Sequence, residues 1–129
     1  MKIAPYLKTV TGALLGVAST IFGPLDALFY GLVFCIVADY ITGICAAVYE
    51  RNLDSRTGFL GILKKIVILT VVALSHTIGE VAGVSAIREL VIGFYIANEG
   101  LSILENAAKM NIKCMEKLKV FLAQIGEKE

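Results

Sequence analysis

The chain has 129 residues, enough for one domain, and 57% of them are hydrophobic while only 18% are charged. Soluble domains are usually about 45–50% apolar and about 25% charged, so this composition, with a mean hydropathy of +0.80, predicts an integral membrane protein. The formal net charge of +1 gives no overall basic surface, which argues against a nucleic-acid partner.

The first predicted element covers residues 1–22, where Lys2 and Lys8 precede an uncharged apolar run. A basic start before such a run is also typical of a signal peptide, but the rest of the chain requires a membrane, so we expect a retained first span. The run is short for a span and reaches sufficient length only if Lys8 extends toward the membrane surface. Gly23 and Pro24 then end it in a tight turn.

The second predicted helix, residues 25–49, carries Asp39 deep inside apolar sequence. A carboxylate at the centre of a span costs about 2.5–3.5 kcal/mol on insertion scales, so we expect Asp39 to line a pore or to contact another helix. The alternative is a charge at a helix end. Thr42 and Gly43 lie beside it, and small residues next to a carboxylate are typical of a helix contact or a water-facing wall.

Residues 50–65 form a polar hinge, and the third helix is predicted to begin within it, near Thr57, and to run to Gly79. Either Asp54 or Ser55 is in position to cap this helix. Two lysines near its start are predicted to anchor it at the membrane surface, and these are Lys64 and Lys65.

The third helix also contains polar positions that are candidates for a pore or for assembly. Ser75 lies towards one side of it, and His76, the only histidine, lies next to Ser75. A lone histidine in a helix is more often a hydrogen-bonded structural group than a metal ligand or a proton relay. Gly79 and Gly83 have the spacing that permits a close helix–helix approach.

The fourth predicted helix, residues 90–106, is apolar except for one stripe. At 100° per residue the stripe consists of Asn98, Ser102 and Glu105, widened on one side by Glu99 and Asn106. Each large apolar residue stabilises the inserted helix by only about 0.3–0.6 kcal/mol. Summed over the helix, this gain nearly equals the cost of inserting the carboxylates. The helix should therefore be stable only where its stripe meets polar groups or water, which indicates assembly or a pore.

The tail from residue 109 onward is too charged to span a membrane but keeps a helical apolar spacing. We expect residues 109–129 to form an amphipathic cytoplasmic helix, separate from a transmembrane domain of residues 1–108. It would lie on an anionic membrane surface or, alternatively, pack against its own copies. The lysines expected to contact that surface are Lys113, Lys117 and Lys119.

The basic residues predict the orientation of the chain. They are concentrated before the first helix, between the second and the third, and after the fourth, whereas the other two connections offer only Arg88. Four spans therefore place both termini in the cytoplasm, and three spans fit the same pattern less well. The predicted fold is an all-α integral membrane protein with about four transmembrane helices and a C-terminal amphipathic helix.

The sequence offers no motif for catalysis. It contains no phosphate-binding loop, no cluster of zinc ligands and no nucleophile motif. Cys35, Cys45 and Cys114 lack paired spacing, so we expect small apolar side chains rather than disulfides or metal ligands. The prediction is a protein that is not an enzyme and that uses no cofactor and no metal.

Taken together, the polar positions of these helices resemble the toxin-secretion and phage-lysis holin family over about residues 25–125. The positions that carry the resemblance are Asp39, Thr42, Gly43 and Ala46; Ser55, Gly58, Gly61 and Lys64; and Phe94, Tyr95, Glu99, Leu101, Ser102, Glu105 and Asn106. The resemblance implies a phage-encoded or prophage-encoded protein that forms homo-oligomers in the bacterial cytoplasmic membrane. It also implies a large lesion through which an endolysin or a toxin leaves the cell.

Two other classes of function remain open from the residues alone. A small ion channel or transporter subunit would use Asp39, Glu99 and His76 for ion or proton movement, and would give currents of fixed size without protein leakage. A structural membrane protein would bind another protein through its polar stripes and would change no permeability by itself.

Overall fold

Helices make up the whole fold of this protein in the residues that its computed structural model describes, 2–110 and 113–127. They are α1 (Ile3–Phe22), α2 (Ala27–Tyr49), α3 (Ser55–Ala82), α4 (Ala86–Lys109) and α5 (Lys113–Glu127). The all-helical class predicted from the sequence is confirmed. α2 and α3 are long and apolar enough to cross a membrane. Spans at α1 and α4 stay a prediction.

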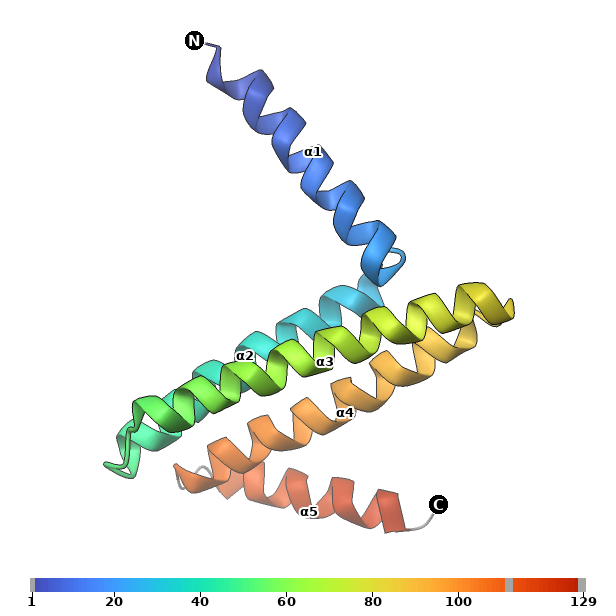
Figure 1. The fold of residues 1–129 in the computed structure, drawn as a ribbon. Coiled ribbons are helices and arrows are strands. Elements are labelled where there is room, and N and C mark those ends of the chain that lie inside the picture. The colour runs from blue at the N-terminus through green and yellow to red at the C-terminus, as the bar shows by residue number, and fades with distance from the viewer. Residues whose placement is uncertain (1, 111–112, 128–129) are drawn as a thin grey trace.

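α2, α3 and α4 lie side by side as a bundle, α1 points away from it, and α5 folds back along α4 (Figure 1). The buried residues of the three helices, together with the half-buried ones that continue their pattern, recur at alternating steps of three and four, the spacing of a coiled-coil seam. In α2 they are Phe29, Leu32, Ile36, Asp39, Gly43 and Ala46; in α3, Lys65, Ile68, Val72, Ser75 and Gly79; in α4, Arg88, Ile92, Tyr95, Glu99, Ser102 and Asn106.

An apolar core fills the middle of this seam. It consists of Leu32, Ile36, Ile68, Val72 and Ile92. Leu32, Val72 and Ile92 have no exposed surface. Lipid tails are as apolar as these side chains, so in a bilayer the core stabilises the bundle through van der Waals packing rather than through transfer from water. The polar residues at either end of the core therefore carry much of the specificity of the helix contacts.

Aspartates cap the N-termini of α2 and α3. The Asp26 carboxylate accepts a hydrogen bond from the Phe29 amide at 3.0 Å. Asp54 accepts from the amides of Arg56 and Thr57 and from the Thr57 hydroxyl, at 3.0–3.3 Å. The Thr57 hydroxyl and these amides hold the pKa of Asp54 below its usual range. Of the two caps proposed from the sequence, Asp54 is the one used, so α3 begins at Ser55.

The glycines of α3 shape the turn into α4. Gly83 has φ +69°, and the Val84 amide donates to the Gly79 carbonyl at 2.9 Å, which is the bonding of a Schellman turn. A Cβ on Gly79 would lie 2.9 Å from the Val84 carbonyl oxygen. Gly79 and Gly83, whose spacing predicted a close helix–helix contact, therefore form the C-terminal turn of α3. The helix continues to Ala82, beyond the predicted end at Gly79.

α4 begins at Ala86, earlier than the sequence indicated. The charged pair Arg88 and Glu89 predicted a boundary there. The first turn of α4 accommodates both, because Arg88 is buried against the neighbouring turn while Glu89 is exposed.

Candidate functional site

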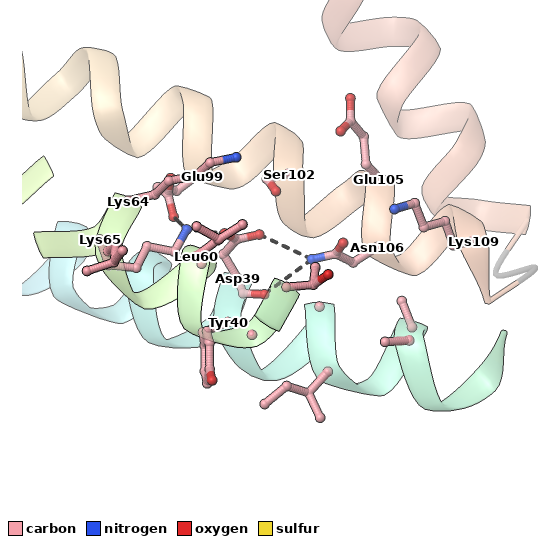
Figure 2. A pocket seen from close by; sticks show the side chains of 18 of the residues that line it. Asp39, Tyr40, Leu60, Lys64, Lys65, Glu99, Ser102, Glu105, Asn106 and Lys109 are labelled. Atoms are coloured by element: carbon pink, nitrogen blue, oxygen red, sulfur yellow. Dashed lines mark hydrogen bonds and ion pairs between the residues drawn. The ribbon is translucent and has the colours of Figure 1, made fainter. Parts of the chain in front are cut away.

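A lysine joins two carboxylates from different helices in the interior of the bundle. The Lys65 ammonium of α3 donates to Asp39 Oδ2 of α2 and to Glu99 Oε2 of α4. Asp39 and Glu99 are only 9% and 3% exposed. The close-up in Figure 2 shows the three side chains pointing toward one another. A single ammonium thus connects all three helices of the bundle.

An amide extends this arrangement by one helical turn. Asn106 Nδ2 lies 3.1 Å from Asp39 Oδ1 and 3.2 Å from the Asp39 carbonyl oxygen (Figure 2). It also lies 3.0 Å from Thr42 Oγ1. The Thr42 hydroxyl donates back to the Ala38 and Asp39 carbonyls, at 2.8 and 3.1 Å. We call Asp39, Thr42, Lys65, Glu99 and Asn106 the polar cluster.

The helix seam places this cluster at one level. Asp39 follows Ile36 in the seam of α2, Lys65 precedes Ile68 in α3, and Glu99 follows Ile92 by one heptad in α4. Since α3 runs antiparallel to its two neighbours, the cluster lies in the C-terminal halves of α2 and α4 and in the N-terminal half of α3. The apolar core ends where the cluster begins.

The buried charges of the polar cluster specify how the three helices pack more than they add to the stability of the bundle. Desolvation of two carboxylates and an ammonium offsets most of their mutual attraction, whereas removal of one partner leaves a buried charge without compensation. Two carboxylates here share one ammonium. The cluster is therefore sensitive to the loss of Lys65 and able to accept a further positive charge.

A cavity of about 1140 Å³ opens beside the polar cluster, between the start of α3 and the end of α4. Its wall is rich in polar groups, among them Asn98, Ser102, Glu105, Lys64 and Lys109. Gly58 and Gly61 line it beside Tyr40, whose hydroxyl oxygen lies 3.6 Å from a Cβ built on Gly58 and whose ring lies 3.6 Å from a Cβ built on Gly61. The bundle thus offers water or another polar group access to the cluster.

A second buried cation closes the opposite end of the bundle. Arg88, only 5% exposed, donates from Nε to the Phe22 carbonyl and from Nη2 to the Pro24 carbonyl, both at 2.6 Å. Its Nη1 lies 3.4 Å from Asp26 Oδ2. The Phe29 amide and then Arg88 hold the pKa of Asp26 below its usual range. We call Arg88 with these three oxygen partners the Arg88 clasp.

The structure brings some of the predicted site residues together and separates others. Asp39, Thr42, Glu99 and Asn106 meet in the polar cluster. Four more line the cavity, and these are Gly43, Asn98, Ser102 and Glu105. Ser75 and His76 lie toward the other end, where the Ser75 hydroxyl donates to the Val72 carbonyl and His76 faces Gly23 of the α1–α2 turn.

The lysines predicted to anchor the membrane surface lie in different environments. Lys64 is exposed on the cavity wall, while Lys65 lies inside the polar cluster, a location that the sequence analysis did not predict. Lys119 of α5 lies 3.4 Å from Glu105, in an exposed pair of the kind that contributes little stability. Lys117 is exposed, and the Lys113 side chain lies outside the described residues.

The sequence analysis did not predict that two cations face the interior of the bundle, although the sequence contains a signal for both. Lys65 and Arg88 occupy seam positions, three residues before Ile68 and four before Ile92. A cation in phase with the buried apolar residues of its own helix is expected to face the bundle.

The described residues, 2–110 and 113–127, contain no group of three or more His, Cys, Asp or Glu side chains placed to hold a metal ion. Cys35 and Cys45 are free thiols, and Cys114 has no described side chain. The candidate site in these residues is therefore the polar cluster, an ion-paired junction of three helices, together with the polar cavity beside it.

Comparison with known proteins identifies the family. Residues 16–127 match the bacteriophage holin family. A protein named probable holin of Bacillus phage phi105 is 35% identical over 94 residues, which cover 72% of this chain and 69% of the relative. An uncharacterised protein of Listeria monocytogenes is 47% identical over 114 residues, covering 84% and 81% of the two chains.

A third relative extends the similarity to nearly the full length. An uncharacterised 14.9 kDa protein of Clostridium perfringens is 36% identical over 130 residues, covering 99% of this chain and 98% of the relative. No solved structure matches this sequence. From the family match over most of its length, this chain belongs to the bacteriophage holin family.

Proposed function

We propose that this protein acts as a holin, assembling in the bacterial cytoplasmic membrane into a lesion that releases an endolysin or an exported toxin. Family membership and the relative named probable holin support a holin role. The two apolar helices α2 and α3 support a location in the membrane.

The observation that carries the proposal is the polar cavity beside the polar cluster. Its wall contains Asn98, Ser102 and Glu105, on helices whose outer faces are apolar. Facing lipid, such a wall costs free energy, because unpaired polar groups lose their hydration. Copies that meet around this wall instead place it against water or against one another, so assembly and opening follow from the same polar surface.

The distribution of basic residues supports an orientation for this assembly. Lys2 and Lys8 lie before and early in α1, Arg51 and Arg56 lie at the turn between α2 and α3, and further lysines follow α4, a distribution that favours both termini in the cytoplasm of a four-span protein. In that orientation the polar cluster and its cavity lie toward the cytoplasmic side. The Arg88 clasp then lies toward the outer side.

The test is the release of a cytoplasmic reporter enzyme from cells expressing the protein, followed in time together with the membrane potential. We expect a silent interval and then sudden release of the reporter. A variant that neutralises the ionic part of the cluster, Asp39→Asn with Lys65→Met and Glu99→Gln, should insert but should delay or lose release. Glu89→Gln is the matched control, because this exposed carboxylate lies at the other end of α4.

Each outcome discriminates between functions. Gradual depolarisation with the reporter retained would contradict a holin and favour a small ion channel or transporter subunit. Unchanged permeability in cells that contain the inserted protein would favour a structural partner. If the triple variant and Glu89→Gln lysed cells with the timing of the native chain, the cluster would have no part in opening.

A further inference from the structure

α1 has almost no partner within its own chain. Every residue from 2 to 17 is exposed, and the contacts of α1 with the described bundle gather near its C-terminal end, where it lies beside α3 and where Phe22 contacts Phe29 and Arg88. In Figure 1 the helix points away from the bundle. A helix of 20 residues with this composition is expected to pack against protein or lipid rather than remain in water.

The two faces of α1 differ. At 100° per residue one face carries Lys8, the small residues Gly12 and Ser19, and one large apolar residue, Leu15. The opposite face carries the large exposed side chains Ile3, Tyr6, Val10, Leu14, Val17 and Ile21. Nothing lies within 4 Å of a Cβ built on Gly12. Small residues let a partner backbone approach closely, so the Lys8 face suits contact with protein and the opposite face suits contact with lipid.

The cavity has the complementary charge. Carboxylates on its wall outnumber the ammonium groups; they are Asp39, Glu50, Asp54, Glu99 and Glu105, against Lys64, Lys65 and Lys109. α1 contributes no carboxylate, and its charged groups are Lys8 and, just before the helix, Lys2. Lys119 of α5 also lies 3.4 Å from Glu105, so the carboxylates still exceed the ammonium groups by one, and an incoming lysine would balance charge at this wall by joining or replacing that exposed pair.

The depth of Lys8 along α1 also matches the depth of the polar cluster along α2. The clasp brings Phe22, Asp26 and Arg88 to one level. At 1.5 Å per residue, Lys8 lies about 21 Å of helix before Phe22, while Asp39 lies about 20 Å after Asp26. If α1 stands antiparallel to an α2 in the same membrane, its Lys8 reaches the level of the polar cluster.

The turn before α2 directs α1 away from the cavity of its own chain. Arg88 binds the carbonyls of Phe22 and Pro24, and a Cβ on Gly23, whose φ is +81°, would lie 2.8 Å from both Arg88 Nε and His76 Nδ1. These contacts fix the direction in which α1 leaves the bundle. The cavity of a neighbouring copy is then the one that α1 can enter.

We propose that α1 of one copy packs into the cavity between α3 and α4 of a second copy, with Lys8 paired to the partner copy's cavity carboxylates, foremost at position 105. This exchange rests on the membrane assembly proposed above and names the contact that builds it. Each copy both inserts an α1 and receives one, so the contact is head-to-tail and propagates into rings or arrays.

Cysteine cross-linking in membranes tests this contact. Two differently tagged full-length chains, each with Cys35, Cys45 and Cys114 replaced by serine, are co-expressed, one carrying Gly12→Cys and the other Leu101→Cys on the cavity wall. We expect an oxidant-dependent heterodimer that carries both tags. The matched control replaces Gly12→Cys by Leu14→Cys, on the opposite face of α1, and should give at least fivefold less heterodimer.

Charge exchange supplies a second, independent measurement. Lys8→Glu in the chain with Gly12→Cys should reduce the heterodimer severalfold, and Glu105→Lys in its partner should restore it. Equal cross-linking from Gly12→Cys and Leu14→Cys would overturn the proposal. A disulfide formed within one chain carrying both cysteines, undiminished by an excess of cysteine-free copies, would overturn it in favour of packing within the chain.

Reporter release measured on the cysteine-free chain separates this inference from the proposed function. Sudden release without a specific heterodimer would retain the holin function and reject the α1 exchange. A specific heterodimer with restored charge exchange but no reporter release would retain the exchange and reject the lesion.

Discussion

On one side of the apolar core of the bundle a buried cation is bound mainly by backbone carbonyls, and on the other side a buried cation is bound by side-chain carboxylates. Arg88 binds the carbonyls of Phe22 and Pro24 in the α1–α2 turn. Lys65 instead binds the carboxylates of Asp39 and Glu99, which belong to two other helices. Both cations occupy positions in the same seam, and the apolar core separates them.

Arg88 and Lys65 differ in how easily their oxygen partners can bind another group instead. The carbonyls around Arg88 move only if the turn itself moves, and Gly23 has no space for a side chain there. The carboxylates around Lys65 lie beside a polar cavity and can take another cation or water. The Arg88 clasp is thus suited to hold the helices together while the polar cluster end changes partners.

Removal of Lys65 should have the largest effect on the bundle. Lys65→Met leaves Asp39 and Glu99 facing each other without a cation, and breaking a buried ion pair in this way costs about 3–5 kcal/mol. We expect a large drop in the thermal stability of the purified protein in detergent, followed by the loss of helical circular dichroism.

The neighbouring lysine is the control for this change. Lys64→Met removes an exposed charge and should alter stability by less than about 0.5 kcal/mol. Adding Asp39→Asn and Glu99→Gln to Lys65→Met should recover much of the loss, because no uncompensated charge remains. Equal effects of the two lysine variants would show that the polar cluster does not join the helices.

Removal of Arg88 should have the next largest effect. Hydrogen bonds from a charged donor contribute about 1.5–3 kcal/mol, so Arg88→Met should destabilise the bundle by about 2–3 kcal/mol and release the α1–α2 turn. Limited proteolysis near Pro24 reports the released turn. Arg88→Lys should recover little, because one ammonium lacks the planar fork that reaches all three oxygens. Full rescue by lysine would mean that charge alone closes this end.

Two glycine-to-alanine replacements should change the stability of the protein in opposite directions. A Cβ on Gly79 meets the Val84 carbonyl oxygen at 2.9 Å, so Gly79→Ala should distort the α3–α4 turn and cost about 1–3 kcal/mol. Gly100 lies within α4 with nothing within 4 Å of such a Cβ, so Gly100→Ala should raise stability by about 0.4–1 kcal/mol. Thermal unfolding in detergent measures both changes. Stabilisation by both would show that the turn at the clasp end is loose.

The sequence predicted the elements of this structure better than their contacts. Alternating apolar runs and polar hinges indicated the helices in their order. Asp39, Glu99 and Asn106 were singled out because polar groups inside apolar helices need partners. Those arguments depend on local sequence, and local sequence also determines the helices.

The partners of those groups depend on helix rotation, which local composition does not report. Lys65 follows Lys64 beside a polar hinge, a pattern typical of a surface anchor, and only its phase relative to Ile68 and Val72 places it in the seam. Arg88 marked a boundary for the same reason. Its main acceptors are the backbone carbonyls of Phe22 and Pro24. Every residue has a backbone carbonyl, so the sequence does not indicate which ones Arg88 binds.

The smallest predicted effect is a pH dependence at the Arg88 clasp. The pKa of Asp26 lies below its usual value of 3.8 because the Phe29 amide and Arg88 favour the carboxylate. The stability that the ionised form contributes is therefore complete above pH 3.8 and is lost as the pH falls through the lowered pKa. A cap of this kind contributes about 1 kcal/mol. Asp26→Asn keeps a capping oxygen without the charge.

The stability difference between the native chain and Asp26→Asn, measured by unfolding from neutral pH down to below pH 3.8, isolates this group, because all other carboxylates titrate in both chains. We expect the advantage of the native chain to shrink in acid. A difference that stays constant with pH would show that Arg88 depends on the carbonyls of Phe22 and Pro24 alone. The clasp would then keep its contacts in acid through Arg88 and the two backbone carbonyls.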